Sequence, residues 1–368
     1  MSLTAAAPAG ATPRFHWLTV ADARRETADA LSVSFVLPPD LAPLYAFRAG
    51  QSLTLRTTLE GEEVRRSYSI CSGPDDGELR IAIKRVEGGQ FSVWAQEALK
   101  PGARIEVMTP TGRFGVPPGT DGRGRVHAAF AAGSGITPVL SIVRTVLARE
   151  PGSHVFLFYG SRATGEILFR GALEDLKDRY LGRLSVFHVL SKEKQDLDIL
   201  NGRLDREKLA VLLKGVLGGV TIDHAYVCGP EGMIAGVEEA LAAHGVPADK
   251  VHVERFTSAL LGRPRAAAPV AKDAPPHAVA ELIIDGARTE VPVAEGEAVL
   301  DAALRAGLDM PFACKGGMCS TCRARLLDGQ VEMAVNYSLE PWETKAGFVL
   351  TCQSRPTSAR VVLDYDTQ

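Results

Sequence analysis

Three cysteines fall within nine residues near the end of the chain, in PFACKGGMCSTC (311–322), and a fourth follows at Cys352. The spacing is C-x4-C-x2-C with one distant cysteine, as in plant-type 2Fe–2S proteins. Two irons need four thiolates, and the low side-chain bulk of KGG lets backbone N–H groups turn toward the sulfurs. The sequence therefore predicts a 2Fe–2S cluster held by Cys314, Cys319, Cys322 and Cys352.

Two other uses of these cysteines compete with the cluster. Structural zinc sites usually combine one C-x2–4-C pair with a second close pair of ligands. Here Cys352 stands alone in GFVLTCQS, a strand-like run. Free buried thiols are the other alternative. The spacing favours the iron–sulfur cluster over both.

The composition is that of a soluble globular protein and excludes several classes of function. Of the 368 residues, 46% are hydrophobic and 23% are charged, and a net charge of −3 gives no general attraction to nucleic acid or acidic membranes. No apolar run approaches the roughly 18–20 residues of a membrane span, and the first residues lack the pattern of a signal peptide. We therefore expect a cytoplasmic protein with no nucleic acid or membrane partner and no disulfide framework.

Changes of composition and periodicity divide the chain. Residues 13–120 contain short alternating strands between Gly and Pro turns, which is typical of an antiparallel β-barrel. From Val126 onward, apolar strands alternate with amphipathic helices, as in a doubly wound α/β domain with a parallel sheet. The stretch 257–276 is rich in Ala and Pro and indicates a linker.

The 92 residues beyond the linker carry 13 acidic and 8 basic side chains, so the C-terminal module is the acidic part of the chain. The predicted fold is therefore multidomain. It comprises a disordered N-terminus, a barrel domain, an α/β domain, a linker and a C-terminal domain, at residues 1–12, 13–120, 121–256, 257–276 and 277–368.

Two stretches of the barrel suit a phosphorylated planar ring. In RRSYSI (65–70), Arg66 could pair with a phosphate, Tyr68 could lie flat on the ring, and Ser69 could hydrogen-bond its edge. In GGQFS (88–92), glycines and a serine open the helical run VWAQEAL, and the N–H groups of a helix start favour phosphate. Taken alone, the first stretch is also an ordinary surface strand and the second an ordinary turn with a helix cap.

Two stretches of the α/β domain end an apolar strand and open a helix. AAGSGITP (131–138) is similar to a dinucleotide fingerprint with proline in place of the third glycine, and Gly133 and Gly135 would let the backbone approach a pyrophosphate. VCGPEGM (227–233) lies where such sheets bind ligands. By itself, Cys228 is interpreted as a small buried apolar residue.

In this order and after a barrel, the four stretches resemble the ferredoxin–NADP reductase superfamily over residues 13–256. The resemblance implies that Arg66, Tyr68 and Ser69 hold the phosphate, the ring and the ring edge of a flavin, which we expect to be FAD. The flavin phosphates would be capped by Gly89, Gln90, Phe91 and Ser92. The nicotinamide nucleotide would be contacted by Gly133, Gly135, Thr137, Cys228, Gly229 and Pro230. Near the flavin at the domain's end would lie Glu254 and Phe256, and the implied catalytic residues are Tyr68, Ser69, Cys228 and Glu254.

An arginine after the second strand of the α/β domain favours NADPH over NADH. A typical NAD site offers an acidic residue to the ribose 2′-OH, whereas an arginine suits a 2′-phosphate. The sequence there is YGSRATGEILFR, with Ser161 and Arg162 at the expected place, Arg170 further along and no acid before Glu166. The alternative is that Arg162 simply faces solvent.

The C-terminal module resembles a plant-type ferredoxin over residues 277–368. Two strand-like runs flank Asp285–Gly286, and AVLDAALRAG (298–307) is a predicted short helix ending at Gly307, ahead of the cysteine loop. The resemblance implies an α+β fold of the β-grasp type. A hydride delivers two electrons and a 2Fe–2S cluster accepts one, so a flavin must stand between nicotinamide and cluster.

A barrel, a nucleotide domain and a ferredoxin in this order resemble the reductase components of bacterial oxygenases. NYSLEPWETKAGFVLTCQ (336–353) is especially similar to the reductase subunits of phenylacetyl-CoA epoxidases. That resemblance implies, as electron acceptor, the diiron subunits of such an oxygenase in phenylacetate degradation. The alternatives are a same-build reductase of a steroid, alkane or aromatic hydroxylase or dioxygenase, and a non-catalytic electron-collecting or zinc-binding subunit.

Overall fold

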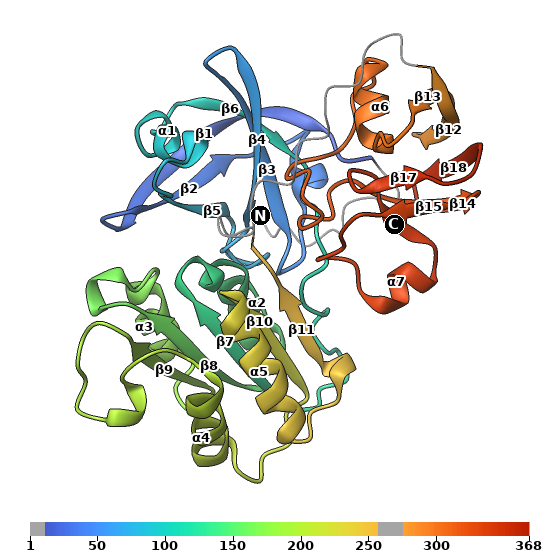
Figure 1. The fold of residues 1–368 in the computed structure, drawn as a ribbon. Coiled ribbons are helices and arrows are strands. Elements are labelled where there is room, and N and C mark those ends of the chain that lie inside the picture. Colours follow the sequence, from blue (N-terminus) through green and yellow to red (C-terminus); the bar gives the residue numbers. More distant parts are fainter. Residues whose placement is uncertain (1–11, 257–274, 368) are drawn as a thin grey trace.

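The computed structural model describes residues 12–256 and 275–367, and three main sheets form within them (Figure 1). The predicted disordered N-terminus lies outside the described residues except for Thr12, and so does the predicted linker except for residues 275 and 276. The first strand of the third domain begins at Pro276, inside the range predicted as linker. Among the described helices, none is long and apolar enough to cross a membrane.

The first sheet is an antiparallel barrel with the strand order β4-β3-β6-β1-β2-β5. An isolated bridge between Ile70 and Ile81 joins its two edges, and alternate apolar side chains such as Leu53 and Leu55 fill its interior. Its elements are β1 (Phe15–Thr27), β2 (Ala30–Val36), β3 (Ser52–Leu59), β4 (Glu62–Ser69), β5 (Leu79–Lys84), α1 (Gln90–Ala98) and β6 (Arg104–Met108).

The second sheet has five parallel strands in the order β11-β10-β7-β8-β9. One of its faces packs against α2 and α3 and the other against α4 and α5, so the predicted doubly wound fold is confirmed. Its elements are β7 (Val126–Ala132), α2 (Ile136–Arg149), β8 (His154–Ser161), α3 (Arg170–Arg179), β9 (Leu184–Leu190), α4 (Arg206–Leu217), β10 (His224–Cys228), α5 (Glu231–Ala243) and β11 (Val251–Glu254).

The third domain has a mixed five-stranded sheet in the order β13-β12-β18-β14-β16 and a separate β15-β17 pair. Asp285 and Gly286 both have positive φ, as the predicted two-residue hairpin requires. The predicted helix is α6, with Gly307 just beyond its end at φ +82°. The elements are β12 (Pro276–Ile284), β13 (Ala287–Ala294), α6 (Val299–Arg305), β14 (Arg323–Asp328), β15 (Val331–Met333), α7 (Pro341–Lys345), β16 (Phe348–Leu350), β17 (Ser354–Pro356) and β18 (Arg360–Asp364).

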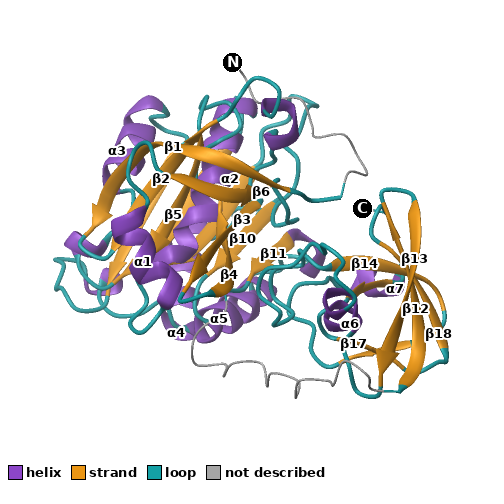
Figure 2. Cartoon of the chain, turned by 90° about the horizontal axis from the view of Figure 1, so that it is seen from above, coloured by secondary structure: helices purple, strands orange, loops and turns teal. Residues whose placement is uncertain are grey.

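The third domain lies beside the barrel, and the loops between α6 and β14 face β3 and β4 (Figures 1 and 2). The carboxyl ends of β7 and β10 meet at the edge of the parallel sheet that is nearest the barrel. The barrel strands, the carboxyl ends of the parallel strands and the loops of the third domain therefore all border the same region of the molecule.

One glycine lets the start of α2 approach β10. A Cβ on Gly135 would lie 2.1 Å from the carbonyl oxygen of Cys228, which no side chain tolerates. Gly133, by contrast, has φ +55° and open space around its α-carbon. Gly135 is therefore required by packing, and Gly133 by its left-handed backbone.

We expect Gly135→Ala to destabilise the α/β domain, because the added methyl forces strand and helix apart. Overpacking of this kind costs about 1–3 kcal/mol. Urea unfolding of the holoprotein measures the loss. The matched control is Gly171→Ala, at a position on α3 with negative φ and no atom within 4 Å of an added Cβ, which keeps or slightly raises stability. Equal midpoints for the two variants would contradict the close approach.

Candidate active site

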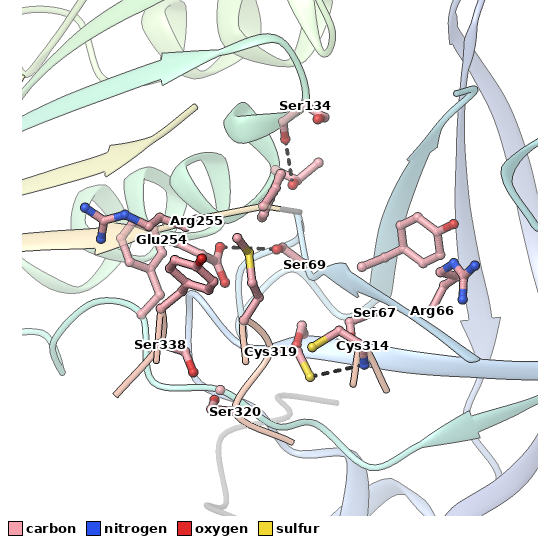
Figure 3. Close-up of a pocket in the computed structure, with 18 of the residues that line it drawn as sticks. Arg66, Ser67, Ser69, Ser134, Glu254, Arg255, Cys314, Cys319, Ser320 and Ser338 are labelled. Carbon is pink, nitrogen blue, oxygen red and sulfur yellow. Dashed lines mark hydrogen bonds between the residues drawn. The ribbon is translucent and has the colours of Figure 1, made fainter. Parts of the chain in front are cut away.

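One cavity of about 940 Å³ has walls from all three domains (Figure 3). The barrel contributes β4 and the start of α1. The α/β domain contributes the beginning of α2 and the end of β11, and the third domain contributes the cysteine loop. Among the lining residues are Arg66, Tyr68, Ser69, Gly89, Ser134, Thr137, Glu254, Phe256, Cys314, Met318 and Cys319.

The barrel wall presents a ring, a hydroxyl and a cation from one strand. Tyr68 packs on Phe91 with ring centroids 5.8 Å apart, and burial raises the pKa of its phenol, so it stays neutral at physiological pH. Arg66 is exposed, and its Nη1 donates to the carbonyl oxygen of Arg65 at 2.7 Å. These groups have the types and positions needed to orient a planar, phosphorylated ligand.

Helix α1 begins at Gln90, earlier than the predicted run VWAQEAL, and no side chain caps it. The Ser92 hydroxyl accepts a hydrogen bond from the Val86 N–H at 3.0 Å, in the turn that precedes the helix. The Phe91 side chain is buried in the barrel core. The backbone N–H groups of this first turn therefore offer the polar contacts to a phosphate.

Glu254 is a titratable group that lines the cavity at the end of β11. Ser69 donates a hydrogen bond to it at 3.3 Å, across the boundary between barrel and α/β domain (Figure 3). Burial raises the pKa of Glu254 to about 8, and the bond from Ser69 offsets part of that rise. Near neutral pH this carboxyl group is thus able both to hold and to release a proton.

The stretch around Gly133 is fixed by contacts behind the cavity wall. Thr137 Oγ1 donates to the Ser134 carbonyl at 2.9 Å, and the Tyr159 hydroxyl donates to the Gly133 carbonyl at 3.1 Å. Sequence reasoning missed Tyr159, which looks like an ordinary apolar strand residue. Ser134 and Thr137 line the cavity, whereas five predicted contacts do not: Gly133, Gly135, Cys228, Gly229 and Pro230. Cys228 is fully buried, and burial raises the pKa of its thiol.

The predicted 2′-phosphate contacts lie apart from the cavity wall, near the carboxyl end of β8. The Arg162 side chain is 64% exposed and lies 3.8 Å from Glu166, whereas Arg170 forms a 2.9 Å ion pair with Glu174. Sequence reasoning missed Glu193, whose carboxylate accepts hydrogen bonds from the Thr164 N–H and hydroxyl group. Its distance from β8 in the sequence hides this contact.

The four predicted cluster ligands come together as two pairs. Side-chain hydrogen bonds join Cys314 to Cys319 and Cys322 to Cys352. Among the described residues, no group of three or more His, Cys, Asp or Glu side chains is arranged around one point as a single metal ion would require. Two pairs of thiols fit two irons that each take two protein ligands.

The cysteine loop is shaped for sulfur. The Gly316 N–H donates to Cys314 Sγ at 3.2 Å and the Cys314 N–H to Cys319 Sγ at 3.5 Å. Lys315 and Ser320 adopt left-handed φ of 50° and 49°, a strained backbone for side-chain-bearing residues. Cys314 and Cys319 are partly exposed and line the cavity. Half of the ligand set therefore faces the wall formed by Tyr68, Ser69 and Glu254.

A barrel, a doubly wound sheet and a domain with four clustered cysteines meet at one cavity, which is the arrangement expected of a flavin- and iron–sulfur-dependent oxidoreductase. Comparison with protein families supports each part. Residues 18–115 match the oxidoreductase FAD-binding domain, residues 130–239 the oxidoreductase NAD-binding domain, and residues 282–357 the 2Fe–2S iron-sulfur cluster binding domain. The predicted fold class and the predicted FAD, nicotinamide and 2Fe–2S domains are thereby confirmed.

Whole-chain comparisons agree. The chain is 45% identical over 355 residues to a subunit of the 1,2-phenylacetyl-CoA epoxidase of Escherichia coli, covering 96% of this chain and 98% of that protein. It is 38% identical over 360 residues to the ferredoxin reductase component of 3-ketosteroid-9-alpha-monooxygenase of Mycobacterium tuberculosis, covering 95% of each. The solved structure of phthalate dioxygenase reductase matches with a TM-score of 0.55 and 25% identity over 95% of this chain and 98% of that one.

The chain therefore belongs to the ferredoxin–NADP reductase-type proteins with a 2Fe–2S ferredoxin domain that form the reductase components of multicomponent oxygenases.

Glu254→Gln is expected to change how stability depends on pH. The pKa of Glu254 rises from the ordinary 4.5 to about 8 in the fold, so the fold favours the protonated acid. The stability that protonated Glu254 contributes to the fold is fully present below pH 4.5 and is lost as the pH rises through 8. The wild type should therefore lose thermal stability relative to Glu254→Gln between these limits.

Melting temperatures across that pH range, for protein with its cofactors bound, make the comparison. Exposed Glu97 on α1 offers the matched control, since Glu97→Gln should leave the pH profile unchanged. Parallel profiles for wild type and Glu254→Gln would contradict a raised pKa at this position.

Proposed function

We propose that the chain passes electrons from NADPH, through FAD and a 2Fe–2S cluster, to the diiron subunits of a phenylacetyl-CoA epoxidase. The observation that carries the electron route is the shared cavity, in which Cys314 and Cys319 face the residues expected around the flavin. The choice of acceptor is supported by 45% identity over nearly the whole length of the Escherichia coli epoxidase protein, against 38% for the steroid monooxygenase reductase.

The residues around the cavity divide the work of binding. When bound, the flavin takes two electrons as a hydride and gives them up singly to the one-electron cluster. We assign the flavin phosphates to Arg66 and the uncapped start of α1, and the ring to Tyr68. Thr137 and Phe256 lie on the opposite, α/β-domain side, where the nicotinamide is expected to enter.

We assign proton transfer out of the cavity to Ser69 and Glu254. Oxidation of one NADPH by two one-electron acceptors releases one proton, which must leave a cavity lined by three domains. Ser69 bridges from the barrel to Glu254 Oε2, and a carboxyl group with a pKa of about 8 takes up and returns a proton near neutral pH.

The preference for NADPH rests on Arg162. Its guanidinium is mostly exposed at the carboxyl end of β8, and its nearest acid, Glu166, is 3.8 Å away, which is a weak contact for an exposed pair. It is therefore available to a 2′-phosphate, whereas Arg170 is engaged by Glu174.

Arg162→Ala is expected to weaken NADPH far more than NADH. A charge-assisted phosphate contact contributes about 1.5–3 kcal/mol, which corresponds to roughly a 10- to 150-fold rise in KM for NADPH. Steady-state ferricyanide reduction with each nucleotide measures the change. The control is Arg179→Ala, at an exposed arginine in the last turn of α3, at the end of the helix away from Arg170. Equal losses with both nucleotides would remove the assignment.

Reconstitution tests the acceptor. Purified oxygenase subunits of a phenylacetyl-CoA epoxidase, mixed with this chain and NADPH, should form epoxide from phenylacetyl-CoA, whereas 3-ketosteroid-9-alpha-monooxygenase should receive few electrons. Cys314→Ser should abolish epoxide formation and keep ferricyanide reduction, because it removes one cluster ligand and leaves the flavin domains intact. Cys71→Ser, in the barrel, is the matched control. Equal support of both oxygenases would leave the acceptor assignment without basis.

The cytoplasm is the compartment we propose, because all six cysteines are free and a thiol-bound cluster suits a reducing environment.

A further inference from the structure

Arg65 is a cation buried between the barrel and the third domain, and none of the roles proposed above uses it. Its neighbours Arg66 and Tyr68 point to the other face of β4, as strand alternation requires, and all three residues contribute atoms to the cavity wall. Only 5% of the Arg65 side chain is exposed. Its guanidinium lies between two rings, 4.9 Å from Phe15 of the barrel and 3.9 Å from Phe312 of the third domain.

The edges of the same guanidinium contact both domains. Nε donates to Glu63 on its own strand at 2.8 Å, and Nη1 donates to the Met310 carbonyl at 3.2 Å, in the third domain. Nη2 lies 3.8 Å from exposed Asp309. Only a planar cation with several N–H donors can stack on Phe312 and donate in its plane to two domains at once.

These contacts fall on the segment that leads into the cysteine loop. Met310 and Phe312 precede Cys314 by four and two residues, and Cys314 lines the flavin cavity. The rate of electron tunnelling falls steeply with distance, and in catalysis generally a misplacement of about 1 Å can cost roughly 10²-fold in rate. A side chain that fixes this segment against β4 therefore controls the distance from flavin to cluster.

The buried charges of this interface each have a partner in their own domain, so they would stay paired if the domains separated. Arg65 retains Glu63, and Glu343 of α7, which accepts a hydrogen bond from Arg113 at 3.1 Å, retains Arg323 at 3.0 Å in its own domain. Since neither buried charge is orphaned, losing the contact carries no large desolvation penalty. The contacts of Arg65 thus serve placement more than the stability of either domain.

We propose that Arg65 is a positioning residue for electron transfer from the flavin to the cluster, acting through its stacking on Phe312 and its bond to Met310. The inference rests on the proposed electron route and adds the side chain that sets its geometry.

The test mixes the anaerobic holoprotein rapidly with NADPH and follows the flavin and iron–sulfur bands separately. In Arg65→Ala we expect flavin reduction within about twofold of wild type and cluster reduction slowed roughly 10- to 100-fold. Arg65→Lys keeps the charge but loses the planar fork, so it should fall between the two. Arg25→Ala is the matched control, at an exposed barrel arginine whose guanidinium donates to Gln96.

Flavin content, iron content and melting temperature accompany each variant, because a merely structural role would lower these and slow both phases together. Cluster reduction at the wild-type rate in Arg65→Lys and Arg65→Ala, or equal slowing of both phases, would overturn the proposal. Should Arg65→Ala fail to fold, Arg65→Lys decides alone. If NADPH never reduces the cluster of the wild type, the proposed electron route itself is wrong. That result is distinguishable from a failure of the Arg65 proposal alone.

Discussion

Electrons can move within this chain only if a two-electron carrier and a one-electron carrier come close together, and the shared cavity is where we propose that they do. Cys314 and Cys319 lie on one wall, while Tyr68 and Ser69 lie on another. No single domain builds this site. Its geometry depends on how the third domain sits against β4, so the contacts of that interface bear directly on the rate of electron flow.

Each domain has a local structural feature that shapes its part of the site. The barrel closes through the bridge from Ile70 to Ile81 and leaves the first turn of α1 uncapped. The parallel sheet brings α2 against β10 because Gly135 has no side chain. The cysteine loop accepts left-handed backbone at Lys315 and Ser320 so that its N–H groups reach sulfur. Left-handed backbone and uncapped N–H groups are thus present where the cluster and the flavin phosphates are expected.

Much of this arrangement could be predicted from the sequence because its signals are local. The cysteine spacing, the Asp285–Gly286 turn and the strand-to-helix stretch AAGSGITP each lie within a short window. What sequence reasoning missed is long-range. Tyr159 supports Gly133 from a different strand, and the use of Arg65 depends on a domain some 245 residues further along the chain. The start of α1 was misplaced because Gln90 and Phe91 follow two glycines and carry no cap. The domain limits and the roles of individual site residues remain predictions.

Anaerobic titration of the purified protein with NADPH, followed by its visible spectrum, tests the shared cavity most directly. We expect the flavin and iron–sulfur bands to bleach together. Bleaching should be complete at about 1.5 equivalents of NADPH, since the flavin holds two electrons and the cluster one. Bleaching of the flavin alone, with a cluster that stays oxidised at excess NADPH, would contradict a direct path from the flavin wall to Cys314 and Cys319.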